Sequence, residues 1–163
     1  MVSKRLINEE GHNRKFLCVI DNTAECNRAV LYAERRATKI GGGLTLVYVS
    51  EPESFQHWIG VEEIMKAEAQ EVGEEALQKA AEFCREHGSI DPELLFRQGK
   101  THEEVLKLIE EDQDIAVLVL AASDSVDGPG PLVSALGGSG NAYTIPVIVV
   151  PCNMTFDEIE SVT

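Results

Sequence analysis

Residues 15–49 read KFLCVIDNTAECNRAVLYAERRATKIGGGLTLVYV, and this stretch decides the fold. The apolar run at residues 16–20 has the pattern of a strand that is covered on both faces. Apolar residues then recur at three- and four-residue spacing over residues 26–40, which predicts an amphipathic helix. Glycines at 41–43 end that helix, and the run at 44–49 predicts a second strand. The order strand, helix, strand indicates a parallel pair joined by a right-handed crossover.

The rest of the chain continues this alternation of helices and strands. Apolar residues at helical spacing predict a long amphipathic helix that starts at Val61 and ends at Gly88. Short apolar runs predict three more strands, at residues 93–97, 115–121 and 146–150. This order indicates an α/β fold, a five-stranded parallel sheet with helices on both faces, doubly wound. Ligands of such sheets bind beyond the carboxyl ends of the strands, where the strand order reverses.

Two of the expected helices begin with capping signals. Asn22 and Thr23 are N-cap candidates for the first helix, and Glu25 follows Asn22 by three residues. The sequence Thr101-His-Glu-Glu104 has the spacing of a capping box for the helix before the fourth strand. We therefore expect both helices to begin with side-chain caps.

The length and charge of the chain bound its domains and partners. A chain of 163 residues with 44% hydrophobic content is sufficient for one domain, which we place at residues 15–151. A polar N-terminal tail (1–14) precedes it, and a loose, polar C-terminal tail (152–163) follows it. The 28 acidic and 14 basic residues give a net charge of -14, which disfavours nucleic acid and acidic membranes as partners.

Cysteine usage and hydropathy indicate a cytoplasmic protein. The four cysteines form no CxxC pair, and Cys18, Cys26 and Cys84 lie on apolar strand or helix patterns, so we interpret them as buried free thiols. No apolar run approaches the roughly 20 residues of a membrane span. The first 14 residues lack the apolar core of a secretion signal.

Glycines cluster after the fourth expected strand. Residues 124–141 read DSVDGPGPLVSALGGSGN, and five glycines fall within the 13 residues 128–140. Glycine just beyond a buried strand lets backbone N–H groups approach a ligand closely, which is a common way to hold a phosphate. The segment is therefore either a phosphate-binding loop or a flexible connection.

Two segments of the chain resemble the universal stress protein family. Residues 15–49 have that family's strand, Asp, capped helix and second strand ending in Val, and residues 121–151 occupy the place of its phosphate loop, final helix and closing strand. The resemblance covers about residues 14–151 and implies a fold like that of the adenine nucleotide alpha hydrolases. It also implies a homodimer that pairs the strand at 146–150 across a two-fold axis. Such pairing protects an apolar edge strand from aggregation.

Members of this family that bind ATP carry the motif G-x2-G-x9-G-[ST], and two registers of that motif compete here. Read by its glycines, the segment gives Ser125-x2-Gly128-x9-Gly138-Ser139, with serine in place of the first glycine. In this register the loop is longer than the family's, and Gly128, Gly130 and Ser139 line a phosphate pocket.

The ungapped register counts directly from the fourth strand. It gives Ala121-x2-Asp124-x9-Ser134-Ala135, which keeps neither the motif glycines nor the final hydroxyl. Compared with the glycine register, it leaves more residues for a helix before Pro146. Asp124 beside a polyphosphate would cost roughly 4 kcal/mol at ~4 Å and an effective dielectric constant of about 20, which would defeat binding.

The resemblance carries over two further positions. Asp21 would accept a hydrogen bond from the adenine amino group, and Val49 would contact the adenine ring. From the residues alone, Asp21 is better explained as a cap of the following helix and Val49 as a core residue. The cofactors that the resemblance implies are ATP or AMP, with Mg²⁺ accompanying ATP.

The sequence predicts a binding protein rather than an enzyme. Its four histidines are scattered without metal-ligand spacing, and its serines lack the context of a nucleophile elbow. We expect a cytoplasmic stress-response or signalling protein that binds an adenine nucleotide as a dimer, hydrolyses ATP slowly at most, and acts through an unknown protein partner. The alternative is the same fold without nucleotide, a dimeric interaction module.

Overall fold

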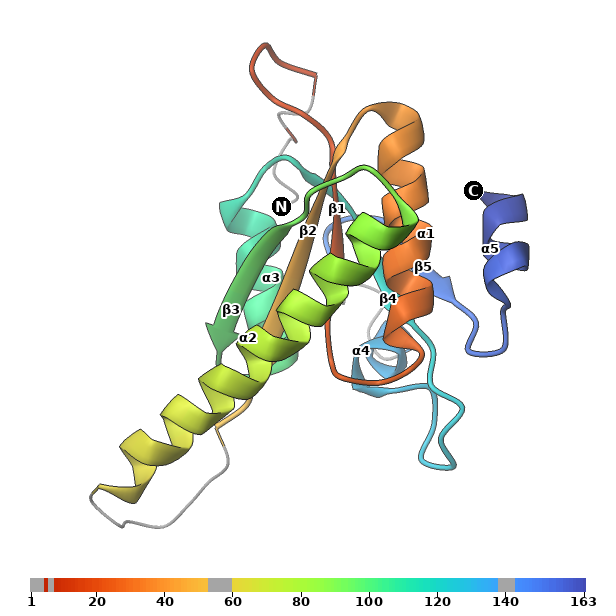
Figure 1. Cartoon of the computed structure of the whole chain (residues 1–163). Coiled ribbons are helices and arrows are strands. Elements are labelled where there is room, and N and C mark those ends of the chain that lie inside the picture. The colour runs from red at the N-terminus through yellow and green to blue at the C-terminus, as the bar shows by residue number, and fades with distance from the viewer. Residues whose placement is uncertain (1–4, 6–7, 53–59, 138–142) are drawn as a thin grey trace.

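The computed structural model describes residues 5, 8–52, 60–137 and 143–163. Its centre is a sheet of five parallel strands in the order β3-β2-β1-β4-β5 (Figure 1). This arrangement confirms the predicted five-stranded parallel sheet. The strands are β1 (Lys15–Val19), β2 (Gly43–Ser50), β3 (Glu93–Gln98), β4 (Ile115–Ala121) and β5 (Val147–Val150).

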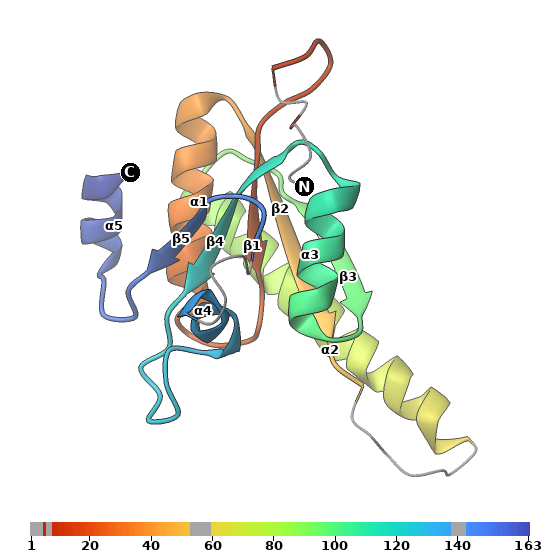
Figure 2. The same cartoon turned by 180° about the vertical axis from the view of Figure 1, so that it is seen from behind.

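Helices cover both faces of this sheet. α1 and α2 lie in front of the sheet in Figure 1, and α3 and the short α4 lie in front of it in the reverse view of Figure 2. Crossovers on the two sides of β1 therefore use opposite faces, as a doubly wound fold requires. The helices are α1 (Cys26–Ile40), α2 (Val61–His87), α3 (Thr101–Glu111), α4 (Pro131–Ser134), the 3-10 helix η1 (Ala135–Gly137) and α5 (Phe156–Val162).

β1 lies at the centre of the sheet and separates two apolar cores. Phe16 and Cys18 belong to the core beneath α1 and α2, whereas Leu17 belongs to the core beneath α3. Leu17 and Cys18 are both 0% exposed. Burial on both faces explains why this strand reads as a continuous apolar run.

Three thiols lie in the first of these cores, as the sequence predicts. Cys18, Cys26 and Cys84 are buried free cysteines, and Cys152 is half-buried. Burial raises the pKa of Cys26 and of Cys84 to about 12, because a thiolate would lose its hydration there. Both thiols are therefore protonated and unreactive at neutral pH.

Glycines end α1, as predicted. Gly41 adopts φ +65°, and the N–H groups of Gly41 and Gly42 donate to the carbonyls of Thr38 and Ala37 at 3.2 and 2.8 Å. A Cβ on Gly42 would lie 2.5 Å from the carbonyl oxygen of Arg14. The left-handed backbone and this close approach together explain the glycines at the turn.

α2 packs closely on an aromatic pair of the sheet. Tyr48 of β2 and Phe96 of β3 are register partners, and their rings are parallel to within 7° with centroids 6.1 Å apart. Gly73 of α2 lies over this pair, where a Cβ would be 2.5 Å from the Phe96 ring and 2.7 Å from the Tyr48 ring. The absence of a side chain at Gly73 lets the helix approach the sheet.

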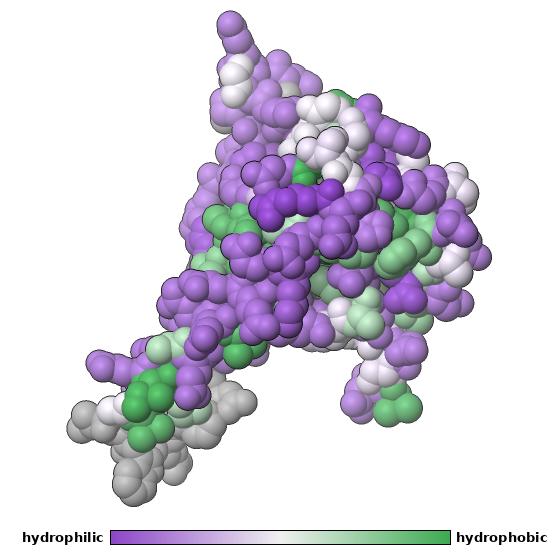
Figure 3. Space-filling model, in the orientation of Figure 1, coloured by the Kyte–Doolittle hydropathy of each residue, from purple (hydrophilic) through white to green (hydrophobic). Residues whose placement is uncertain are grey.

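The first turns of α2 extend past the sheet (Figure 1). Val61 and Ile64 in these turns are 48% and 61% exposed. Figure 3 shows apolar surface at this projecting end, on a face that is otherwise mainly hydrophilic. The hydrophilic surface accords with the net charge of -14.

The C-terminal segment forms a capped helix, so the expectation of a loose end at residues 152–163 is wrong. Thr155 opens α5 with a capping box. Its hydroxyl accepts a hydrogen bond from the Glu158 N–H at 3.1 Å, and its own N–H donates to the Glu158 carboxylate at 2.8 Å. The reciprocal pair satisfies two N–H groups at the start of the helix.

A buried apolar residue and polar contacts from α1 hold α5 and the residues beside it in place. Ile159 is 0% exposed and belongs to the first core. Arg35 of α1 donates to the Glu160 carboxylate at 2.6 Å, and Arg28 donates to the carbonyl of Met154 at 2.7 Å. The end of the chain is thus part of the packed domain.

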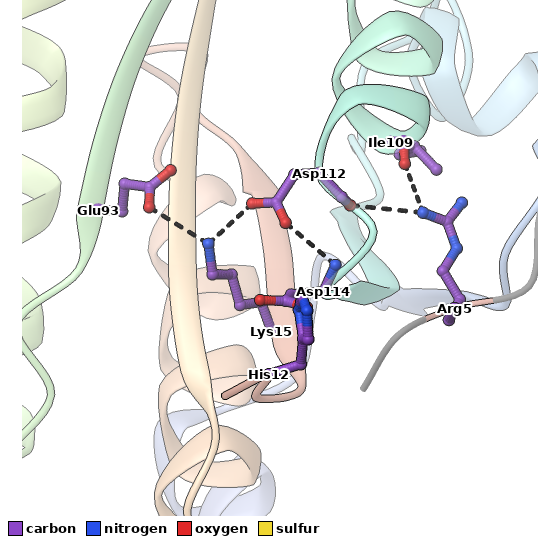
Figure 4. Close-up of polar contacts among 7 residues, drawn as sticks. All are labelled: Arg5, His12, Lys15, Glu93, Ile109, Asp112 and Asp114. Carbon is purple, nitrogen blue, oxygen red and sulfur yellow. Dashed lines mark hydrogen bonds and ion pairs between the residues drawn. The ribbon is translucent and has the colours of Figure 1, made fainter. Parts of the chain in front are cut away.

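Charged contacts anchor the N-terminal segment near the end of α3 (Figure 4). Lys15 Nζ lies 2.8 Å from the Asp112 carboxylate and 3.3 Å from the Glu93 carboxylate. In the preceding tail, Arg5 donates to the carbonyl of Ile109. These contacts join the start of β1 to β3 and to the end of α3.

Gly73→Ala tests the close approach of α2. The added methyl group would meet both aromatic rings, and overpacking of this kind costs about 1–3 kcal/mol. Higher helix propensity offsets up to about 1 kcal/mol of that cost. We expect urea denaturation to show a decrease of about 1–2 kcal/mol in the free energy of unfolding.

Phe96→Leu supplies the control, because it replaces the ring that the new methyl group meets with a smaller side chain. The cost of Gly73→Ala should be smaller in the Phe96→Leu background than in the parent chain. A Gly73→Ala variant more stable than the parent would contradict the close packing.

Candidate functional site

Asp21 and Val49 lie at the carboxyl edge of the sheet, which is the lower edge in Figure 1. Val19 and Val47 are the last register partners of β1 and β2, so Asp21 and Val49 each lie two residues beyond that pair. Ile20 extends the pairing, since its N–H donates to the Val47 carbonyl at 2.8 Å. Asp21 is exposed, and Val49 is half-buried against the core beneath α3. The structure thus places the two predicted base-binding residues at the same edge of neighbouring strands.

The Asp21 carboxylate also orders the turn that leads into α1. One of its oxygens accepts from the N–H of Thr23 at 3.0 Å and from the Thr23 hydroxyl at 2.6 Å. Asn22 between them adopts φ +63°. The N-cap of α1 is Glu25, which makes no side-chain cap hydrogen bond, so the predicted caps by Asn22 and Thr23 are wrong. Asp21 stabilises a local Asx turn ahead of the helix.

Glu51, just beyond β2, caps α3 from a distant part of the chain. Its Oε1 accepts from the N–H of Thr101 at 2.9 Å and from the Thr101 hydroxyl at 2.7 Å. The predicted capping box of Thr101 and Glu104 is therefore wrong, because Thr101 is the first helical residue and its N-cap, Lys100, makes no side-chain cap hydrogen bond. The two hydrogen bonds from Thr101 lower the pKa of Glu51.

Glu51→Ala tests this cap. Loss of a cap acceptor costs about 1 kcal/mol, which we expect to appear in the free energy of unfolding at pH 7. The folded-state pKa of Glu51 is lowered, so its contribution is complete above the ordinary pKa of 4.5 and is lost as pH falls through the lower folded value. The parent and Glu51→Ala chains should therefore converge in stability as pH falls below 4.5.

Glu51→Gln is the matched control, because its amide oxygen still accepts hydrogen bonds but carries no charge. We expect a smaller loss than for alanine at pH 7, and a difference in stability between the Gln and Ala variants that does not change with pH, because neither variant titrates at this position. A constant difference between the parent and Glu51→Ala from pH 7 to pH 3 would contradict a role for the carboxylate, since Glu51 would titrate in that range.

The loop after β4 closes on itself. Its two arms are joined by a hydrogen bond from the Ser123 N–H to the Pro129 carbonyl at 3.1 Å. At its tip, the Gly128 N–H donates to the Ser125 carbonyl at 3.0 Å, and the Asp127 N–H donates to the Ser125 hydroxyl at 3.1 Å. Figure 2 shows this loop projecting from the carboxyl edge. The N–H of Gly128 is therefore engaged within the loop rather than turned toward a ligand.

Gly130 forms the start of α4. It adopts φ +101° at the N-cap position, and Pro131 follows as a proline in the first turn. Its carbonyl accepts from the N–H of Ser134 at 2.9 Å. Leu132 packs against the core beneath α3, and its carbonyl accepts from the Tyr143 hydroxyl at 3.3 Å. Gly130 thus allows the abrupt change of direction between the projecting loop and the core.

The helix after this loop begins earlier than either motif register requires. It starts at Pro131, whereas the glycine register would start it after Ser139 and the ungapped register after Ala135. Residues 143–146 are not helical, so the longer helix that the ungapped register favours is absent from the described residues. Gly138 and Ser139 lie outside the described residues.

The charge at this end of the sheet does not favour a polyphosphate. Asp124 and Asp127 are exposed in the loop. The sequence contains no lysine, arginine or histidine after Lys107. From this part of the chain, a phosphate would meet backbone N–H groups and serine hydroxyls but no cationic side chain. Within the described part of the chain, no group of three or more His, Cys, Asp and Glu side chains is arranged to hold a metal ion.

Comparison with known sequences identifies the family. The Universal stress protein family matches residues 12–140. The chain belongs to this family. This match confirms the predicted family. A separate comparison of this universal stress protein with curated proteins found no match.

Solved structures share its fold. Universal stress protein UspA from Lactobacillus plantarum aligns with a TM-score of 0.72 at 15% identity, over 86% of this chain and 99% of that chain. A universal stress protein in complex with cAMP aligns at 0.61 and 18% identity, over 86% and 98%. The universal stress protein from Archaeoglobus fulgidus in complex with dAMP aligns at 0.51 and 18% identity, over 83% and 96%.

These likenesses confirm the α/β fold, and the roles of individual site residues stay predictions. Asp21 and Val49 lie at the same edge of neighbouring strands, while Gly128 and Gly130 have conformational roles in the loop. Sequence reasoning missed Glu51, because its partner Thr101 is 50 residues away along the chain. Among the described helices, none is both long and apolar enough to cross a membrane.

Proposed function

We propose that this universal stress protein binds an adenine nucleotide at the carboxyl edge of its sheet and prefers a monophosphate to a triphosphate. One observation carries the proposal: Asp21 just after β1 and Val49 near the end of β2 each lie two residues beyond the last register pair of these adjacent strands. A carboxylate there can accept a hydrogen bond from an adenine amino group, and a valine side chain can cover the ring. Two structurally similar universal stress proteins are in complexes with cAMP and dAMP, nucleotides with one phosphate.

The preference for one phosphate follows from the loop after β4. Gly128 has its N–H engaged by Ser125, which removes a donor that a phosphate chain would use. Asp124 and Asp127 add negative charge at the same end. Because repulsion grows with the charge of the ligand, each further phosphate is bound less favourably. The proposed activity is binding, with its output passed to a protein partner.

Calorimetric titration with AMP and with ATP plus Mg²⁺ tests this proposal. We expect saturable binding of AMP, with ATP weaker by about tenfold or more because of repulsion from the loop. Asp21→Ala should weaken AMP binding by about tenfold, since hydrogen bonds to charged groups contribute about 1.5–3 kcal/mol.

Thr23→Val is the matched control for Asp21→Ala. It removes the hydroxyl that donates to Asp21 and leaves the carboxylate, so AMP binding should be retained. Absence of saturable binding for both nucleotides at millimolar concentration would overturn the proposal and favour the dimeric interaction module. Equal AMP affinity for Asp21→Ala and the parent would remove Asp21 from the site.

We also propose that the chain forms a homodimer through β5. In the described residues β5 pairs with β4 alone. The carbonyls of Pro146 and Val150 accept from N–H groups of β4 and of the residue just after it, at 3.0 and 2.9 Å. Because hydrogen-bonding direction alternates along a strand, the N–H and C=O groups of Val147 and Val149 face the open side. A second β5 can pair with these groups and close the edge.

Val149→Pro tests the dimer. Proline removes an N–H that faces the open side and leaves the ladder with β4 intact. We expect sedimentation equilibrium to show a dimer for the parent chain and a monomer for Val149→Pro, with circular dichroism unchanged. Val149→Ala keeps the N–H and should remain dimeric. A parent chain that is monomeric at high micromolar concentration would contradict the proposal.

A further inference from the structure

A hollow of about 320 Å³ lies on the α1 face of the sheet, at the end opposite Asp21. Its floor is made of apolar side chains from three neighbouring strands: Phe16 of β1, Val117 of β4 and Ile148 of β5. Phe16 and Val117 are register partners near the starts of their strands. The hollow is therefore separate from the carboxyl edge where we place the nucleotide.

Side chains with hydrogen-bond donors surround this apolar floor. Tyr32 and Arg36 come from one face of α1, four residues apart, and Arg14 precedes β1. The residues that line the hollow include no aspartate or glutamate, although the chain has a net charge of -14. An anion in the hollow would meet two guanidinium groups and no carboxylate from its walls.

The donors of these side chains are largely unused. Among the described residues, the Arg14 guanidinium and the Tyr32 hydroxyl have no hydrogen-bond or ion-pair partner. Arg36 makes one long contact, from Nη1 to the carbonyl of Thr163 at 3.4 Å. The other arginines of the domain surface, by contrast, each donate at 2.9 Å or less, namely Arg28, Arg35, Arg85 and Arg97.

We propose that this hollow binds a small organic acid with an apolar body. The carboxylate pairs with Arg14 and Arg36, whose planar guanidinium groups match carboxylate geometry, and the Tyr32 hydroxyl adds a third donor. The hydrocarbon part of the ligand lies on Phe16 and its neighbours and leaves water. The volume is at the lower end for small-molecule pockets, about 300 Å³, so a medium-length acyl chain or a single aromatic ring has the expected size.

Titration of the isotope-labelled full chain with octanoate, followed by amide NMR shifts, tests this site. We expect saturable shifts centred on Val117 and Ile148. Octanol has the same chain length without the charge. It should bind at least about tenfold more weakly than octanoate, because hydrogen bonds to charged groups are stronger than those to neutral ones. Arg14→Gln and Arg36→Gln should each weaken octanoate binding by about tenfold.

Two further variants test whether octanoate binds in the hollow and not elsewhere on the protein. Arg85→Gln removes the same charge at a residue outside the lining, where Arg85 pairs with Asp91, and should leave octanoate affinity unchanged. Ala116→Phe fills the hollow from β4 without a change of charge and should abolish octanoate binding. NMR shifts of residues far from β4 show whether that variant is folded.

Three outcomes would overturn the proposal. The first is the absence of saturable octanoate shifts at the hollow. The second is octanol binding as tightly as octanoate, which would mean hydrophobic binding without recognition of the carboxylate. The third is unchanged octanoate affinity in both Arg14→Gln and Arg36→Gln, and these variants decide the question even if Ala116→Phe fails to fold.

Discussion

The burial of β1 on both faces is the constraint on which the rest of the structure depends. Leu17 and Cys18 are adjacent in the chain, fully buried, and belong to different cores. A shift of one residue in the pairing of β1 would exchange its side chains between the two cores, so its register is strongly specified. The positions at both ends of β1 are fixed as a result. Asp21 lies two residues beyond its carboxyl end, and Lys15 forms its ion pairs at the other end.

Features of the fold that depend on periodicity could be predicted from the sequence, whereas features that depend on distant partners could not. The apolar run at residues 16–20 and the glycine at Gly41 were sufficient for a buried strand and for the end of α1. The start of α3 was not predictable in the same way. Its spacing satisfies a local capping box, but the acceptor is Glu51, 50 residues earlier in the chain. A local pattern contains no information about which remote carboxylate will arrive there.

The candidate site likewise has features that the sequence predicts and features that it does not. The order of strands places Asp21 and Val49 at one edge of any sheet of this kind, so their shared edge follows from topology. The identity of Gly128 does not reveal whether its N–H is free, because that depends on how the whole loop closes. The C-terminal helix is a different case. Thr155 and Glu158 form a visible capping box in the sequence, but a single buried apolar residue, Ile159, gives too weak a periodic signal.

The cap that Glu51 provides has a consequence for the order in which the chain assembles. Thr101 and Glu51 are far apart in sequence, and closing a loop of that length costs entropy before the contact repays it. The Glu51 cap can therefore form only in a chain in which the end of β2 and the start of α3 have met. This contact of α3 thus depends on a long-range closure of the chain, whereas the hydrogen bonds within the helix are local.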